Sequence, residues 1–473
     1  MPAGKRNPRP GNNRTKDERV DILARLNKPA FASDTDQTLW LLIELTGQVD
    51  AERARLPLQV VTLVDASGTM FRFQFTPEQY QHWRNLAQTR GEIQAATSDA
   101  REVRVWRGET LEELRREVQT PMSEVVRGLM SEVEQLGSQD QMAVIAFADR
   151  ARVLYDATGG MDKPACLDVL QQLRDQPGEF NLGNRTFMAK AIEQAGQFLT
   201  DRNGDTLKRL VIITDGLVHD PRQTQRNLHD LRARGLSVTT LGIGEEFDEE
   251  FLMSIADRSG GEYYYCENSG DLETRLKEEF KALRATVLRD LEFGITGENG
   301  ATVLELFQAT PAMRMFEEVD EEMGWMTVRV GQAQADRTIR LLARVAVPPL
   351  DIGEYEIARM RVQYRGLRDA PPSEDSAAVF AAVGSDVPED PEVRNLVDRL
   401  EVYLATRRAQ WATEDQDFAI ATRNLRDAAG MATRLGETHL AEQLEEHAVA
   451  LETGAPPSPT RTKRIKAATR RLA

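Results

Sequence analysis

The chain has 473 residues and a net charge of −16. This length allows two to four domains with sizeable cores, and the acidic balance argues against a protein that binds nucleic acid or anionic membranes over its whole surface. The two cysteines, Cys166 and Cys266, exclude a disulfide framework and a cysteine-type zinc site, and their apolar contexts are typical of core residues.

The amino-terminal region carries no pattern typical of export. Residues 1–16 are basic and rich in Pro, Gly and Asn, which predicts a disordered segment and no secretory signal. No apolar run reaches the length of a transmembrane helix. We therefore expect a cytoplasmic protein. Further along, a short helix is predicted at about 17–28, and the pattern of residues 38–45 indicates a strand.

A buried strand that ends in oxygen-bearing side chains is the first sign of a functional site. Residues 59–64 are apolar or β-branched almost throughout, which is typical of a strand buried on both faces. The strand leads directly into Asp65, Ser67 and Thr69, at the edge where open α/β sheets bind ligands. Oxygen ligands suit a hard cation such as Mg²⁺ or Mn²⁺. Taken alone, the same residues also fit a turn that caps a helix.

Two further stretches repeat this design. Thr186 precedes a helical pattern that covers 187–200, and residues 210–214 form a second buried strand that ends in Asp215. A parallel sheet would gather all three loops at one edge. The sequence therefore predicts that five oxygen-bearing side chains converge there.

Together the three loops resemble those of a von Willebrand factor type A domain with a complete metal-ion-dependent adhesion site. The first loop of that family reads Asp-x-Ser-x-Ser, and here Thr takes the last place and keeps the hydroxyl. The resemblance covers about residues 58–285 and is to the bacterial intracellular type. It implies Mg²⁺ or Mn²⁺ as the cofactor, one coordination position left for an Asp or Glu of a partner protein, and these metal ligands: Asp65, Ser67, Thr69, Thr186 and Asp215.

The periodicity of the apolar residues changes along the chain and divides it into domains. It predicts a doubly wound, mainly parallel α/β sheet with a β-sandwich domain and a C-terminal helical domain. The predicted segments are a disordered tail with a short helix (1–30), a strand that joins the β-domain (38–45), the A domain (56–285), the β-sandwich (286–385), a helical hairpin domain (391–453), and a Pro/Ser linker with a basic tail (454–473).

An insertion at 71–119 interrupts the A domain just after its first metal loop. Alternation of Phe71, Phe73 and Phe75 predicts a strand, and Thr76 with Gln79 forms a capping box for a following helix. The insertion is either a surface excursion or a lip that selects the partner. The basic tail is likewise open to two interpretations, a solvated cationic segment or a contact for an acidic surface.

The pattern favours a binding scaffold over an enzyme. No Gly-rich phosphate loop or nucleophile elbow is present, and Ser67 stands where an aspartyl phosphatase needs a general acid. The resemblance suggests a complex with an AAA+ ATPase or a Ser/Thr kinase–phosphatase pair. No nucleic-acid or membrane partner is expected, and the oligomeric state stays open. Two alternatives are a metal-dependent phosphohydrolase and a metal-free structural module.

Overall fold

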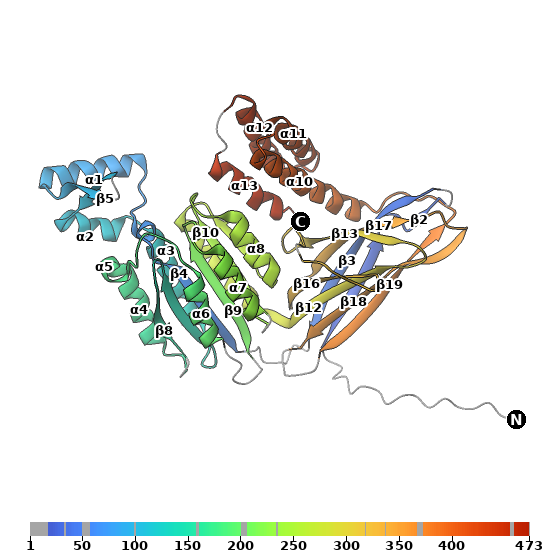
Figure 1. Cartoon of the computed structure of the whole chain (residues 1–473), viewed down its shortest axis with the longest axis horizontal. Helices are drawn as coiled ribbons and strands as arrows, with labels where there is room; N and C mark the ends of the chain where they lie inside the picture. Colours follow the sequence, from blue (N-terminus) through green and yellow to red (C-terminus); the bar gives the residue numbers. More distant parts are fainter. Residues whose placement is uncertain are drawn as a thin grey trace. The chain divides into compact units, whose positions relative to one another are not determined.

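In the computed structural model, the chain forms two compact units (Figure 1). One unit consists of the described residues before 56 together with 285–397, and the other of 57–284 and 398–472. The described residues are 18–32, 35–49, 57–98, 101–157, 160–199, 206–232, 235–316, 318–335, 337–366, 372–454 and 458–472.

The first unit is a strand-rich domain made of two sheets. One sheet has the order β1-β3-β17-β13-β14 and the other the order β15-β16-β12-β18-β19-β2, and residues of both contribute to one hydrophobic core. The strands are β1 (Glu18–Leu26), β2 (Ala30–Phe31), β3 (Gln37–Val49), β12 (Thr286–Gly297), β13 (Thr302–Thr310), β14 (Arg314–Met315), β15 (Asp320–Glu322), β16 (Trp325–Gln334), β17 (Ile339–Val347), β18 (Gly353–Arg365) and β19 (Ser373–Val383).

Strand β3 joins parts of the chain that are far apart in sequence. It pairs antiparallel with β1 on one side and with β17 on the other, so that Leu45 lies opposite Ile339. Leu41 and Ile43 of β3 are fully buried in the shared core. The whole A-domain segment is thus inserted between strands of a single sheet.

The helix predicted at about 17–28 is wrong, because Glu18–Leu26 forms β1. Val20 and Leu26 are buried, while Leu23 is largely exposed, which is the two-residue alternation of a half-buried strand. The apolar residues of this short stretch also fit a helical face. The segment forms a strand and not a helix because β3 offers a hydrogen-bonding edge with which it pairs. This is an effect of tertiary structure.

The second unit is built around a six-stranded sheet of order β11-β10-β9-β4-β7-β8, parallel except for the last pair. All residues of β4 and β9 are buried, as expected for central strands that are mainly apolar or β-branched. The strands are β4 (Leu58–Asp65), β7 (Gln141–Phe147), β8 (Ala151–Asp156), β9 (Leu207–Thr214), β10 (Ser237–Ile243) and β11 (Tyr263–Cys266).

Helices cover both faces of this sheet (Figure 1). On one face Val61 and Leu63 of β4 share a core cluster with residues of α6, α7 and α8, and on the other α3 packs against α4 and α9. This arrangement confirms the predicted fold class. The helices are α3 (Pro121–Gln135), α4 (Lys163–Asp175), α5 (Pro177–Phe180), α6 (Ala189–Phe198), α7 (Pro221–Arg232), α8 (Glu249–Ser259) and α9 (Leu272–Arg284).

The insertion forms a small substructure with its own apolar cluster, made by Trp83, Leu114, Val118 and neighbouring aromatic rings. Its elements are a 3₁₀ helix (Gly68–Phe71), α1 (Pro77–Arg90), β5 (Ile93–Ser98), β6 (Arg101–Trp106) and α2 (Gly108–Glu117). The capping box of Thr76 with Gln79 is confirmed. The strand predicted at 71–75 is wrong, because the 3₁₀ helix extends to Phe71 and the rings of Phe73 and Phe75 pack on the cluster. The two strands of the insertion, β5 and β6, pair with each other.

Four helices follow the strand-rich domain: α10 (Pro391–Glu414), α11 (Phe418–Arg434), α12 (Thr438–Glu452) and α13 (Pro459–Arg470). Residues 398–472 belong to the second unit. The last helix occupies the segment predicted as a basic tail, and the interpretation as a solvated tail is wrong. Lys463, Lys466 and Arg470 are each no more than 7% exposed.

Two buried cations of α13, Lys466 and Arg470, have their counterions on α8. The Lys466 ammonium lies 3.2 Å from a carboxylate oxygen of Glu249 and 2.6 Å from one of Glu250. Arg470 makes a two-pronged contact of 2.8 and 2.9 Å with Asp257. The acidic surface that the basic segment contacts is therefore part of the same chain.

Both cysteines are buried and unbridged, and burial raises the pKa of each thiol to about 12, which makes them poor nucleophiles. No helix in the described part of the chain combines the length and the apolar composition needed to cross a bilayer.

We expect Arg470→Ala to destabilise the second unit strongly, by about 3–5 kcal/mol in the free energy of unfolding, because it removes the buried cation that pairs with the largely buried carboxylate of Asp257. Urea denaturation followed by circular dichroism would measure this. Arg426→Ala is the matched control, since it removes ion pairs to Glu445 and Glu452 that are about half exposed and should cost little. Equal losses of stability in the two variants would contradict a stabilising role for the pair of Arg470 and Asp257.

Candidate metal centre

The first loop holds Asp65 at the carboxyl end of β4 with its carboxylate buried. Its Oδ1 accepts a hydrogen bond of 2.9 Å from the backbone N–H of Ser67. The Ser67 Oγ lies 2.9 Å from the Thr69 Oγ1. The loop therefore turns back on its own strand, and the two hydroxyls lie side by side next to the carboxylate.

The second and third loops close on the first through hydroxyl groups. The Thr186 Oγ1 donates to the Asp65 Oδ2 at 3.2 Å, and the Thr214 Oγ1 donates to the same oxygen at 2.6 Å. The Thr69 Oγ1 donates to the Asp215 Oδ1 at 2.8 Å. The five side chains predicted as metal ligands thus lie in one hydrogen-bonded chain that runs across three loops.

Small residues and backbone bonds let these loops approach one another. The Gly68 N–H donates to the Gly183 carbonyl at 3.0 Å, which links the first loop to the second. A Cβ on Gly216 would lie 2.8 Å from the Thr186 Oγ1, so any larger residue there would push against a candidate ligand. Gly183 has a φ of +136° and is closely approached by Asp149, which again favours glycine.

The electrostatics of the site favour a bound cation. Burial raises the pKa of Asp65. Burial, together with the charge of Asp65, raises the pKa of Asp215 to about 7. Among the residues that the structure describes, neither carboxylate has a Lys or Arg partner, and only hydroxyl and amide groups donate to them. Two neighbouring buried carboxylates are costly to ionise unless a positive charge lies between them.

The donor set fits a hard divalent cation. Within the described residues no group of three His, Cys, Asp or Glu side chains comes together as a metal site, so a cation here depends on hydroxyl oxygens beside the two carboxylates. Such an all-oxygen set suits Mg²⁺ or Mn²⁺ and suits zinc poorly. Ser67, Thr69 and Thr186 would supply the hydroxyls, and Asp65 and Asp215 the charge.

Two residues that sequence reasoning missed hold the loops in place. Thr214 makes the shortest hydrogen bond to Asp65, but in the sequence it is only the last residue of a predicted buried strand. The imidazole Nδ1 of His219 accepts from the backbone N–H of Thr186 at 3.1 Å, and the backbone N–H of His219 donates to the Thr186 carbonyl at 2.8 Å. No spacing pattern in the sequence links His219 to Thr186.

Family models match two parts of the chain. Residues 116–278 match the von Willebrand factor type A domain, and residues 391–473 match the Sll0103-like, C-terminal alpha-helical domain. The first match begins at the end of the insertion, so it includes Thr186 and Asp215 but not the loop of Asp65. Strand β4 nevertheless lies at the centre of the same sheet, between β9 and β7.

Two curated bacterial relatives align with parts of this chain. The uncharacterized protein YfbK of Escherichia coli is 25% identical over 165 residues, which cover 34% of this chain and 28% of that protein. The uncharacterized protein sll0103 of Synechocystis is 21% identical over 249 residues, which cover 52% and 57%. The chain thus matches only part of each relative's length.

Two solved structures cover nearly the whole chain. The von Willebrand factor type A protein from Catenulispora acidiphila aligns over 97% of this chain and 99% of its own, with a TM-score of 0.69 and 16% identity. The ArnB paralog VWA2 from Sulfolobus acidocaldarius aligns over 96% and 98%, with a TM-score of 0.52 and 14% identity. At these identities the likeness shows the fold.

We expect Mg²⁺ to raise the melting temperature of the wild type and not that of Asp215→Asn. A site at a hundred times its dissociation constant gains about 2.7 kcal/mol, and each kcal/mol is worth about 2–4 °C for a unit of this size. In EDTA the variant should melt at or above the wild type, because the substitution removes one of two buried like charges.

Asp149→Asn provides the control for this melt. Asp149 follows β7 at the same sheet edge, but it is partly exposed and already paired with Arg185. It should keep the full response to Mg²⁺. A wild type that melts at the same temperature in EDTA, Mg²⁺ and Mn²⁺ would show that the carboxylates hold no cation.

Proposed function

Because this chain carries a von Willebrand factor type A domain, we propose that it is a metal-dependent protein-interaction module. The cation is Mg²⁺ or Mn²⁺, and its ligands come from the three loops at the carboxyl edge of the sheet. The partner is a protein that presents an Asp or Glu side chain. The residues that hold the metal are Asp65, Ser67, Thr69, Thr186 and Asp215.

One observation carries this proposal more than any other. Asp65 is fully buried, Asp215 is largely buried, and no described side chain supplies a positive charge to either. Two such carboxylates are costly to ionise together at neutral pH, and a bound cation removes that cost. The hydroxyls around them are neutral, so they can coordinate a cation without cancelling its charge.

Several residues around the site would orient the metal ligands. Thr214 and the Ser67 N–H orient the Asp65 carboxylate, and the bonds between Thr186 and His219 fix the second loop. When bound, the cation supplies an electrophilic site for a carboxylate. The two protein carboxylates balance the charge of a divalent cation, but one coordination position stays open. The cation can therefore still bind a third carboxylate, which comes from a partner.

The insertion is well placed to contribute to the choice of partner. Its 3₁₀ helix starts at Gly68, inside the metal loop, and its Gln74 accepts a hydrogen bond of 2.7 Å from Ser269 of the A domain. It also has a core of its own, around Trp83 and Leu114. A lip that is tied to the A domain where it begins and is internally packed can offer a defined surface next to the metal.

The module is proposed to act by binding and not by catalysis, as A domains generally do. An assembly with an AAA+ ATPase or a Ser/Thr kinase–phosphatase system, in the cytoplasm, is the setting that we propose for it. Neither nucleic acid nor a membrane is required as a partner. Phosphohydrolase activity is not favoured by any observation at the site, since Ser67 takes the position that a general acid would need.

A metal-dependent pull-down tests the proposal. Immobilised wild-type protein should retain a partner from a lysate of the source organism in Mg²⁺ and release it in EDTA. Thr69→Val should retain at least tenfold less, because it removes the hydroxyl that lies between Ser67 and Asp215 at nearly constant shape. Quantitative mass spectrometry of the eluates measures the difference.

Thr433→Val is the matched control for that pull-down. Thr433 lies exposed in α11, outside the metal loops and the insertion, and its hydroxyl donates to the Ala429 carbonyl of the same helix, so this variant should retain as much partner as the wild type. A partner that stays bound in EDTA, or that binds Thr69→Val as well as the wild type, would contradict binding through the metal.

A further inference from the structure

One arginine lies next to the candidate metal ligands without being one of them. Arg185 directly precedes Thr186, whose hydroxyl donates to Asp65. Because consecutive Cα atoms are only about 3.8 Å apart, the two side chains leave the second loop at almost the same point. The side chain of Arg185 is 60% exposed. Its guanidinium is therefore a solvent-accessible cation at the border of the candidate metal centre.

The backbone of the second loop decides where this side chain points. Thr186 forms an isolated parallel bridge with Val218, so the backbone is extended there. Successive side chains of an extended chain point to opposite sides, and Thr186 is turned toward Asp65. Arg185 and Phe187 share the other side, where the guanidinium lies 5.0 Å from the centroid of the Phe187 ring. The guanidinium thus flanks the metal loops and does not reach into them.

Several contacts hold Arg185 in this position. Its backbone N–H donates to the Oδ1 of Asp149 at 3.0 Å, and its Nε donates to the same oxygen at 3.3 Å. The Phe187 ring beneath the guanidinium also packs against the imidazole of His219, with ring centroids 5.5 Å apart, and His219 accepts a hydrogen bond from Thr186. An arginine that is positioned before binding loses less conformational entropy when it pairs with a ligand.

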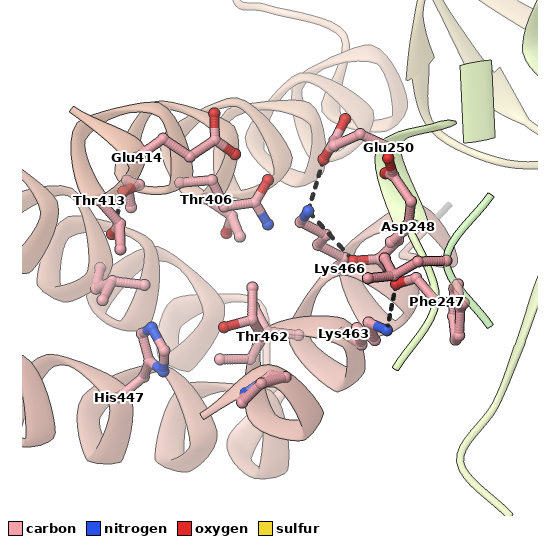
Figure 2. A pocket seen from close by; sticks show the side chains of 17 residues that line it. Phe247, Asp248, Glu250, Thr406, Thr413, Glu414, His447, Thr462, Lys463 and Lys466 are labelled. Atoms are coloured by element: carbon pink, nitrogen blue, oxygen red, sulfur yellow. Dashed lines mark hydrogen bonds and ion pairs between the residues drawn. The ribbon is translucent and has the colours of Figure 1, made fainter. Parts of the chain in front are cut away.

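The two terminal nitrogens of this guanidinium are open. Only the Nε of the side chain makes a hydrogen bond, and neither Nη1 nor Nη2 has a hydrogen-bond partner among the residues that the structure describes. Two lysines of α13 that reach the same edge of the sheet are different. Lys463 donates to two backbone carbonyls of the loop after β10, and Lys466 pairs with Glu250 (Figure 2). Arg185 therefore keeps donors for a group outside the chain.

The open side of the guanidinium fits a carboxylate. Two parallel N–H groups of an arginine match the two oxygens of a carboxylate and give it a defined orientation. Asp149 already occupies the Nε side, so a doubly charged group such as a phosphate would meet more repulsion than a singly charged carboxylate. Because the guanidinium points away from Asp65, this carboxylate is a different one from that which coordinates the metal.

We propose that Arg185 binds a second acidic side chain of the partner, beside the Asp or Glu that coordinates the metal. The partner segment carries two acidic residues at a fixed spacing, and Arg185 selects for the second. This inference rests on the proposed function, because it presupposes metal-dependent binding of a first carboxylate. It adds the chemistry of the partner segment and a residue that determines specificity.

Selection from a library of random peptides displayed on phage tests the proposal. The full chain is immobilised in Mg²⁺, and bound phage are eluted with EDTA. The wild type should enrich peptides that share one Asp or Glu and carry a second acidic residue at a constant spacing. Arg185→Glu should enrich peptides that keep the first acidic residue and have Lys or Arg in the second position.

The outcomes of this selection separate the inference from the proposed function. Peptides that share one acidic residue, with no preference at a second position, would overturn the inference and leave the metal-dependent binding of a carboxylate intact. If EDTA releases no enriched peptide at all, both are overturned. Asp215→Asn serves to remove peptides that bind elsewhere, since it lacks one of the candidate metal ligands.

Fluorescence anisotropy with a labelled peptide from the selection measures the size of the effect. Arg185→Gln should weaken binding at least fivefold in Mg²⁺, since it removes a charge-assisted pair. Replacing the second acidic residue of the peptide should weaken wild-type binding equally and should not add to the loss in the variant. Arg359→Gln is the matched control, because Arg359 of β18 is 51% exposed and paired with Glu356. A loss in Arg185→Gln no larger than in this control would reject the role of Arg185.

The melting temperature distinguishes a lost contact from a damaged metal loop. Arg185→Gln should keep the full rise in melting temperature from EDTA to Mg²⁺, because its side chain bonds to Asp149 and not to a candidate metal ligand. If the variant loses this rise together with the peptide, Arg185 acts by supporting the second loop, and its assignment as a contact for the partner is overturned.

Discussion

The like charges of Asp65 and Asp215, held next to each other at the ends of two adjacent buried strands, are the constraint on which the unit depends. Parallel pairing of β4 with β9 brings the strand ends together, and full burial of both strands removes water from around Asp65. Each surrounding feature then serves to hold these charges. Hydroxyls bridge them, Gly216 leaves room between the loops, and the neighbouring loops are tied by backbone bonds.

The sequence was informative wherever the structure depends on local patterns. Buried central strands read as continuous apolar runs, and the residue that ends such a run in a parallel sheet has a known location, so that Asp65, Thr186 and Asp215 were expected at one edge. Thr214 and His219 could not be found in this way. Their roles depend on distances of 2.6 and 3.1 Å to residues more than thirty positions away, and no short-range pattern encodes such contacts.

The elements that were predicted wrongly share a physical cause. Glu18–Leu26 is short enough to fit helix or strand by pattern, and pairing with β3 decided between them. The last helix reads as a solvated cationic tail because its charges are visible in the sequence and the carboxylates of α8 that neutralise them are more than two hundred residues away. In both cases the partner is distant in sequence, and the partner determines the structure.

The position of β3 has a consequence for the way the chain is made. Its partner β17 follows only after the roughly 290 residues between Val49 and Ile339, so at about 5–20 residues per second a ribosome needs about 15–60 s to deliver it. During that interval β1 can cover one edge of β3, while the other edge stays open and apolar, and such an edge invites pairing with foreign chains. The A domain is complete first, so the domain that begins the chain is among the last parts to finish folding.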